Sequence, residues 1–141
     1  MGLEPLNVAA PLLDTHVWIW WMRRDERLGA ASLLYLDRLP LDDRPAVADI
    51  SLWEITMLVE RRRLALNGSL EDWLETASHP RTVRVMPISA SIAADTTGLP
   101  RALRDPADRI IVATSRVLKL PLLTYDRAIL RLRLTDRWSA T

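Results

Sequence analysis

Short apolar runs alternate with longer segments of helical periodicity along this chain. Four runs have the length and composition of strands buried on both faces, and they cover residues 10–13, 46–49, 83–88 and 121–125. The segments between and after them predict helices over residues 16–22, 28–39, 51–63, 69 onward, 89 to about 98, 105 onward and 127–133. A short last strand fits residues 134–138. Strands that alternate with helices in this way predict an α/β domain with a mainly parallel sheet and right-handed crossovers.

Two of the predicted helices carry clear local signals. The helix that begins near residue 51 buries one face, since apolar side chains recur at helical spacing at Leu52, Ile55 and Val59. The last long helix opens at Asp105 and Pro106, because aspartate caps helix N-termini and proline suits the first helical position. Its predicted inner face carries Ile110, Ala113, Val117 and Leu118.

The composition indicates one globular domain and excludes several kinds of site. The 141 residues, 49% of them hydrophobic, fit a single domain over residues 1–141 with a core over about 10–130. Without cysteine there is no disulfide, no thiolate zinc site and no cysteine nucleophile. The two histidines are too few for a histidine-rich metal site. Only four glycines occur, and no glycine-rich phosphate-binding motif or Gly-x-Ser-x-Gly motif is present.

The sequence shows no sign of targeting to a membrane. Residues 1–7 lack the positive region and the apolar stretch of a signal peptide. No segment reaches the ~18 uninterrupted apolar residues of a membrane helix. Together with the lack of cysteine, which fits a reducing compartment, this predicts a cytoplasmic protein without a membrane partner.

The basic residues are almost all of one kind. The net charge is only +1, but 18 of the 19 basic residues are arginine, a side chain suited to bidentate phosphate contacts. A codon bias toward arginine in a GC-rich genome is the favoured explanation of the composition as a whole. Six arginines flank the acidic positions described next and could hold the phosphates of a bound strand, namely Arg23, Arg24, Arg27, Arg101, Arg104 and Arg109.

Five carboxylates stand where an apolar run stops or a helix begins. They are Asp14, Glu54, Asp105, Asp108 and Asp126. In an open α/β sheet these positions share the edge formed by the carboxyl ends of the strands, where ligands bind. Two unit charges ~4 Å apart repel by roughly 4 kcal/mol at an effective dielectric of about 20, so several carboxylates together need a cation. Oxygen ligands alone favour a hard cation, Mg²⁺ or Mn²⁺.

Each of these acids also has a purely structural interpretation. The four aspartates are placed as helix caps, turn residues or first-turn acids, which the helix dipole favours. Ser51 and Glu54 have the spacing of a capping box, in which Glu54 reaches back to the Ser51 amide. A cap and a ligand are compatible, since one carboxylate oxygen can cap while the other binds metal. His16 is expected to support the site rather than to bind metal, and Thr124 or Tyr125 could hydrogen-bond a carboxylate.

Four motifs in order along the chain resemble those of PIN domains, and most of all VapC-type toxins of toxin–antitoxin pairs. The motifs lie at residues 12–18 (LLDTHVW), 50–55 (ISLWEI), 105–114 (DPADRIIVAT) and 123–127 (LTYDR). The resemblance spans about residues 10–130 and implies an α/β/α sandwich around a central parallel sheet. It implies a Mg²⁺- or Mn²⁺-dependent endoribonuclease, a hydrolase of phosphodiester bonds in structured or single-stranded RNA.

The resemblance also assigns roles. Asp14, Glu54, Asp108 and Asp126 match the acidic quartet of the family, and Asp105 matches an accessory acid of this subgroup. The resemblance implies a homodimer, inhibited by a small antitoxin that inserts a segment into the acidic groove. Residues 1–9 form a longer leader than the family usually shows.

Two other functions are compatible with acids at strand ends. One is a PIN domain that binds RNA without cleaving it, although such degenerate members usually lose one or more of the acids. The other is a phospho-accepting receiver-like signalling domain that binds Mg²⁺. Receiver domains use a lysine after their last strand, whereas Lys119 precedes the strand predicted at residues 121–125, so the nuclease is the favoured interpretation.

Overall fold

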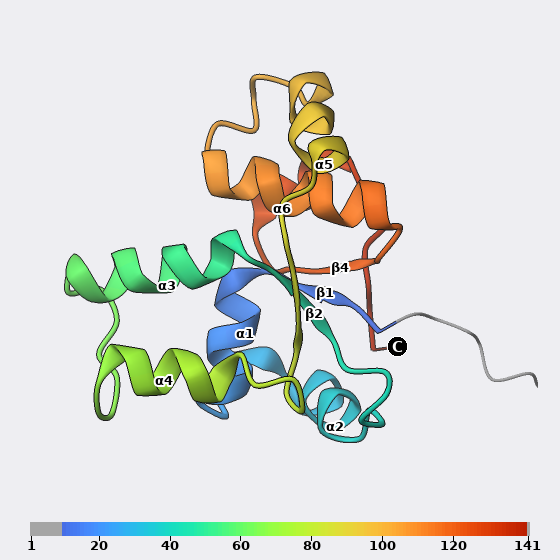
Figure 1. Cartoon of the computed structure of the whole chain (residues 1–141). Coiled ribbons are helices and arrows are strands. Elements are labelled where there is room, and N and C mark those ends of the chain that lie inside the picture. Colours follow the sequence, from blue (N-terminus) through green and yellow to red (C-terminus); the bar gives the residue numbers. More distant parts are fainter. Residues whose placement is uncertain (1–9, 141) are drawn as a thin grey trace, which may run out of the picture.

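A four-stranded sheet forms the centre of the molecule in the computed structural model, which describes residues 10–140 (Figure 1). The strands are β1 (Leu12–Leu13), β2 (Ala46–Ala48), β3 (Arg84–Met86) and β4 (Leu122–Leu123). They lie in the order β3-β2-β1-β4, and all three pairings are parallel. The predicted parallel sheet is therefore confirmed. The expectations about a signal peptide and a long leader concern residues outside the described range.

Seven helices connect and flank these strands in the described part of the chain. Their bounds are α1 (Thr15–Met22), α2 (Ala30–Asp37), α3 (Ile50–Glu60), α4 (Leu70–Ala77), α5 (Ala90–Asp95), α6 (Pro106–Leu118) and α7 (Arg127–Leu132). Two short 3₁₀ turns, Glu26–Leu28 and Thr96–Gly98, precede α2 and follow α5. Among these helices, none has the length and apolar character needed to cross a membrane.

Helices cover both faces of the sheet, because alternate residues of each short strand point to opposite sides. Leu13, Val47 and Leu123 join a cluster with buried side chains of α1, α2 and α3. Leu12, Ala46 and Leu122 face the other way, into a cluster with α5, α6 and α7. In Figure 1, α5 and α6 accordingly lie on one side of the strands, and α1, α2 and α4 on the other. This is the three-layer α/β/α sandwich that the family resemblance implied.

Three local predictions were wrong. The helix predicted over residues 51–63 begins at Ile50 and ends at Glu60, so Ser51 lies inside it. The inner face of α6 was predicted only in part, since Val117 and Leu118 pack partly buried against the core but Ile110 does not belong to that cluster. Ile110 is half-buried, whereas Ile111 and Val112 are fully buried, although Ala113 is buried as expected. The last strand predicted at 134–138 is reduced to a single parallel bridge between Leu122 and Arg137.

The strand order also decides against the receiver-like alternative. Receiver-like domains are built on a doubly wound sheet of order 2-1-3-4-5. Here β1 lies between β2 and β4, and β3 is at the edge beside β2. The carboxyl ends of β1, β2 and β4 consequently lie next to one another, and the acids that follow them share one edge.

Candidate active site

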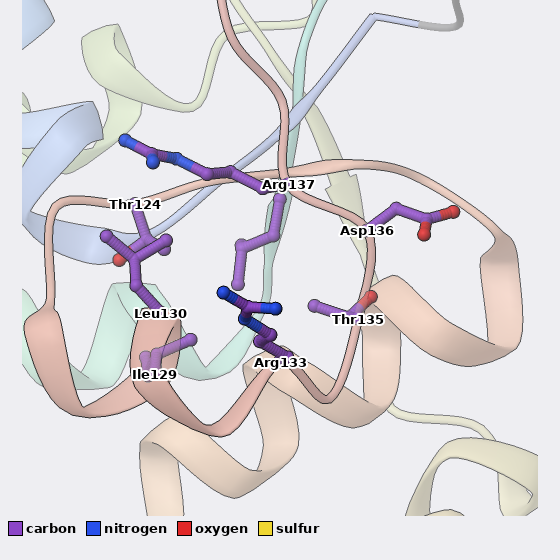
Figure 2. Close-up of a pocket in the computed structure, with 8 residues that line it drawn as sticks. Thr124, Ile129, Leu130, Arg133, Thr135, Asp136 and Arg137 are labelled. Carbon is purple, nitrogen blue, oxygen red and sulfur yellow. The ribbon is translucent and has the colours of Figure 1, made fainter.

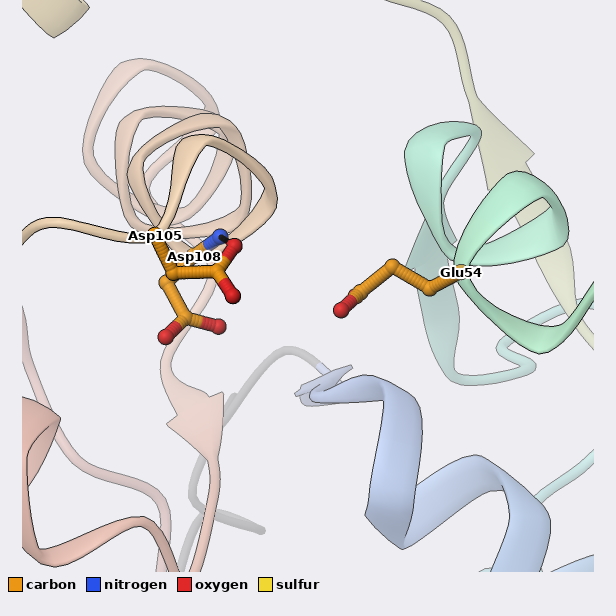
Figure 3. A group of neighbouring side chains, drawn as sticks. All are labelled: Glu54, Asp105 and Asp108. Atoms are coloured by element: carbon orange, nitrogen blue, oxygen red, sulfur yellow. Dashed lines mark hydrogen bonds between the residues drawn. The ribbon is translucent and has the colours of Figure 1, made fainter. Parts of the chain in front are cut away.

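Three carboxylates from two helices meet at the carboxyl edge of the sheet. Glu54 extends from α3 toward Asp105 and Asp108 at the start of α6 (Figure 3). Each offers one carboxylate oxygen, and these three oxygens lie within 4.8 Å of one another. The two helices are brought together because each begins just beyond the sheet edge, α3 directly after β2 and α6 after the loop that ends at Asp105.

Asp14 and Asp126 complete the acidic group from the other side. Asp14 follows β1 and is buried, with only 3% of its surface exposed. Thr124 joins the two, since its hydroxyl donates to Asp14 Oδ2 (2.7 Å) and accepts from the Asp126 amide (3.0 Å). The structure therefore gathers all five predicted acids at one place, although they are spread over more than a hundred positions of sequence.

Burial and mutual repulsion raise the pKa of two of these acids, Asp108 and Glu54. The pKa of Asp108 is raised to about 8, first by burial and then by the negative charges of Asp14, Asp105, Asp126 and Glu54. The pKa of Glu54 is also raised, mainly by burial, with further contributions from Asp14 and Asp105. Both shifts have the direction expected for carboxyls that lose water and face like charges.

Three of the acids cap helices as well. Asp14, Asp105 and Asp126 are the N-caps of α1, α6 and α7. Asp14 accepts one bond, from the Thr15 amide, and Asp105 and Asp126 each accept bonds from two amides of the following turn. In Asp105 and Asp126 the same oxygen, Oδ1, accepts both amides. Within residues 10–140 neither Oδ2 receives a hydrogen bond. The capping interpretation is thus right, and it leaves the second oxygen of both residues available to a ligand.

Glu54 does not form the capping box that its spacing predicted. The N-cap of α3 is Asp49, and Ser51 is the second helical residue. The Ser51 hydroxyl instead lies 2.8 Å from the Thr15 hydroxyl, which in turn donates to a Glu54 oxygen. A buried pair of hydroxyls thus aims Glu54 at α6. Sequence reasoning missed Thr15 and Ser51 in this role, and the only signal was a threonine directly after the strand-end aspartate.

His16 supports the acidic group from α1. Its Nδ1 lies 3.6 Å from Asp14 Oδ2, and its Nε2 accepts a 3.0 Å bond from the Tyr125 amide. Its ring packs edge-on against Trp20, with centroids 4.9 Å apart. The imidazole therefore ties the segment after β1 to the segment after β4, as expected for a supporting residue.

Several of the arginines predicted to hold phosphates are engaged elsewhere. Arg109 donates four hydrogen bonds to backbone carbonyls of residues 96–103, so its guanidinium is a structural clamp. Arg24 pairs with Asp37 and Arg27 with Asp25. The prediction that Arg109 lines the crevice as a phosphate ligand is therefore not supported by its contacts.

The acidic group has the donor chemistry of a divalent cation site. All its ligand atoms are carboxylate oxygens, which hard cations prefer. Within the described chain, no lysine or arginine forms an ion pair with Glu54, Asp105, Asp108 or Asp126. The charge that raises the pKa of Asp108 is thus not balanced by the protein itself, and a bound cation would balance it.

A separate pocket of about 450 Å³ lies between α7 and the C-terminal segment (Figure 2). It is lined by Thr124, Arg133 and Arg137 among others, but by none of the five acids. Its connection to the acidic group is indirect and runs through Thr124, whose hydroxyl bonds Asp14.

Comparison with known sequences gives a consistent result. The profile described as PIN domain matches residues 12–134. Ribonuclease VapC22 of Mycobacterium tuberculosis is 38% identical to this chain over 120 residues, which cover 84% of this chain and 88% of that protein. The family profile thus spans most of the described structure, including the positions of all five acids.

Three solved structures have a similar fold. A chain of a toxin–antitoxin complex from Klebsiella pneumoniae aligns with a TM-score of 0.62 at 18% identity, over 94% of this chain and 98% of that one. A chain of FitAcB from Neisseria gonorrhoeae gives a TM-score of 0.66 at 24% identity, over 92% and 96%. A chain of FitAB bound to an IR36 DNA fragment gives 0.65 at 23%, over 92% and 94%. At these identities the likeness concerns the fold.

Proposed function

The chain belongs to the PIN domain family, and from this membership we propose that it is a divalent-metal-dependent endoribonuclease and the toxin of a toxin–antitoxin pair. The observation that carries the proposal is the convergence of Glu54, Asp105 and Asp108 within 4.8 Å at the carboxyl edge of the sheet. The 38% identity to a protein named a ribonuclease supports the assignment of RNA as substrate.

We assign Asp14, Glu54, Asp108 and Asp126 as the catalytic quartet, with Asp105 as an accessory ligand of the same metal. A bound Mg²⁺ or Mn²⁺ would neutralise charge on the scissile phosphate and lower the pKa of a water that attacks it. The protein's own contribution is orientation. Thr124 fixes Asp14, and Thr15 fixes Glu54, so the carboxylates need little rearrangement to bind a cation.

Protonation of Asp108 is linked to cation binding in this proposal. With a pKa of about 8, the Asp108 carboxyl holds a proton at neutral pH when no cation is present. Because a carboxylate must be deprotonated to bind metal, cation binding at pH 7 releases that proton.

We further propose the partners that the family relationship suggests. These are RNA as substrate, a small antitoxin that inserts a segment into the acidic groove, and a second copy of the chain in a homodimer, all in the cytoplasm. The fold shared with a chain of the toxin–antitoxin complex from Klebsiella pneumoniae supports the antitoxin as a partner.

Cleavage of structured and single-stranded RNA in the presence of Mg²⁺ or Mn²⁺ tests the proposed activity. We expect Asp14→Asn and Asp126→Asn to reduce the rate at least about 100-fold, as removal of one charge-stabilising group in an active site commonly does. Glu71→Gln, which alters an acid in the first turn of α4, is the matched control and should cleave like the parent. Equal cleavage by all four proteins would show that the assigned site is wrong, and RNA binding without cleavage would favour the non-catalytic alternative.

A further inference from the structure

A groove leads away from the acidic group between α3 and the start of α6. Its volume is about 360 Å³, within the roughly 300–1,000 Å³ of small-molecule sites. Glu54 and Asp105 stand at its inner end. The remainder is lined chiefly by Trp53, Met57, Leu58, Arg61, Arg63 and Pro106. The groove is thus continuous with the proposed active site and differs from it in chemistry.

The lining residues of α3 form one stripe along the helix. Positions 54, 57, 58 and 61 recur at the i, i+3, i+4 and i+7 spacing of a single helical face. The stripe begins with the acid Glu54, continues through Met57 and Leu58, and ends with Arg61. Seven residues of helix place the Arg61 backbone about 10 Å beyond that of Glu54. In Figure 1, α3 extends outward from the sheet edge, so the stripe leads from the acids toward solvent.

Two features of this groove have no structural role in the described chain. Trp53 is 54% exposed, which is unusual for the largest apolar side chain. Arg61 and Arg63 are exposed, and within residues 10–140 neither makes an ion pair or a side-chain hydrogen bond. They differ in this from Arg109, whose guanidinium is bound to carbonyls.

We propose that this groove is an RNA subsite, in which the base next to the scissile phosphate stacks on Trp53 and the following phosphates contact Arg61 and Arg63. The inference rests on the proposed nuclease function. Single-stranded RNA presents flat bases and anionic phosphates in alternation, and proteins bind it by aromatic stacking and basic side chains. Among its lining residues, the groove offers an exposed indole and two cations without ion pairs in the described chain, together with two of the acids.

Four variants separate this subsite from the fold. Trp53→Leu removes the aromatic face, and Trp53→Tyr retains one. Arg61→Gln with Arg63→Gln removes both cations of the groove. Arg62→Gln is the matched control, because Arg62 belongs to the same exposed turn but does not line the groove. All altered side chains are exposed, so unchanged melting temperatures are expected and are measured first.

Binding is measured by fluorescence anisotropy of a labelled single-stranded RNA oligonucleotide, with each variant placed on an Asp108→Asn background so that the probe is not cut. We expect Trp53→Leu to weaken binding about 5- to 150-fold, the range of one stacked base, and Trp53→Tyr to stay near the parent. The double arginine variant should reduce the slope of log affinity against log salt by about 1.4, or ~0.7 for each lost phosphate contact. Arg62→Gln should leave affinity and slope unchanged.

Cleavage by the same variants with Asp108 intact gives an independent readout. Loss of a substrate-binding contact outside the reacting centre should raise KM with little change in kcat. The subsite is overturned if the parent cuts RNA but the Trp53→Leu and double arginine variants have the same RNA affinity, salt dependence and KM as Arg62→Gln. In that case the proposed nuclease activity is retained. If RNA binding and KM are unchanged but the groove variants bind a protein partner more weakly, the groove is assigned to that partner instead. A parent that neither binds nor cleaves RNA would overturn both.

Discussion

Asp108 is the residue on which the charge of the acidic group acts most strongly. Its pKa of about 8, against a usual value of 3.8, means that the folded protein holds a proton that the unfolded chain releases at about pH 4. The folded state therefore binds more protons between pH 4 and pH 8, and stability falls as pH rises through that window. Above about pH 8 both states are ionised, and this contribution no longer changes.

Asp108→Asn should remove this dependence, because asparagine keeps the shape of the side chain without its charge. Solvent screening of a half-buried carboxyl reduces the effect, so we expect a gain of about 1–2 kcal/mol at pH 8 and a melting temperature higher by several degrees. Melting curves at pH 5, 7 and 9 in EDTA measure it. Asp42→Asn, an exposed loop acid, should leave the pH profile unchanged. If the stability of Asp108→Asn falls with rising pH as steeply as that of the parent, ionisation of Asp108 is not the cause of the pH dependence.

At the scale of elements, the segment that precedes α6 is fastened to the helix by the side chain of Arg109. Arg109 donates to the carbonyls of Thr96, Leu99, Pro100 and Leu103, with distances of 2.7 to 3.1 Å. These bonds fasten the segment before α6 onto its first turn, which carries two of the acids. The planar guanidinium reaches several acceptors at once, which the single ammonium of lysine cannot do.

We therefore expect Arg109→Lys to lower the free energy of unfolding by about 2–4 kcal/mol, because it leaves part-buried carbonyls without donors. Urea denaturation measures this loss. The matched control is Arg116→Lys, in the surface pair with Asp95, where about 1 kcal/mol or less is expected. If the two substitutions have equal effects, Arg109 is not the clamp of this segment.

The contrast between these elements explains what the sequence could predict. Strand–helix alternation and acids at strand ends are local patterns, and they led to the parallel sheet and to the five converging residues. The contacts of Arg109 and the Thr15–Ser51 hydroxyl pair depend on elements far apart in sequence. The capping-box spacing of Ser51 and Glu54 was misleading because it considers only neighbours in sequence. The hydrogen-bond donor to Glu54 is the hydroxyl of Thr15, which is distant in sequence. Periodicity identified part of the buried face of α6 but missed Ile111 and Val112. The buried face is wider than a single apolar stripe, because it also includes Thr114 and Ser115.

At the scale of the whole molecule, charge is nearly balanced overall and strongly unbalanced at the sheet edge. The net charge is +1, yet five carboxylates gather at this edge, and burial together with the negative charges of the other four raises the pKa of Asp108. A phosphate strand would be repelled by that edge unless a cation occupied it. Cation binding should therefore both stabilise the fold and permit RNA to bind, and these two effects should have the same metal dependence.

Thermal unfolding with increasing Mn²⁺ tests the first effect without any substrate. A ligand that binds only the folded state adds about 2.7 kcal/mol at 100 times its Kd, so the melting temperature of the parent should rise with Mn²⁺ concentration by several degrees. Asp14→Asn removes one proposed ligand and should reduce the rise, whereas Glu71→Gln should keep it. Because Asp108 releases a proton when the cation binds, the rise at a fixed Mn²⁺ concentration should be larger at pH 8 than at pH 6. An equal rise in Asp14→Asn would place the cation elsewhere on the protein, and no rise in the parent would remove the cation from the proposed site.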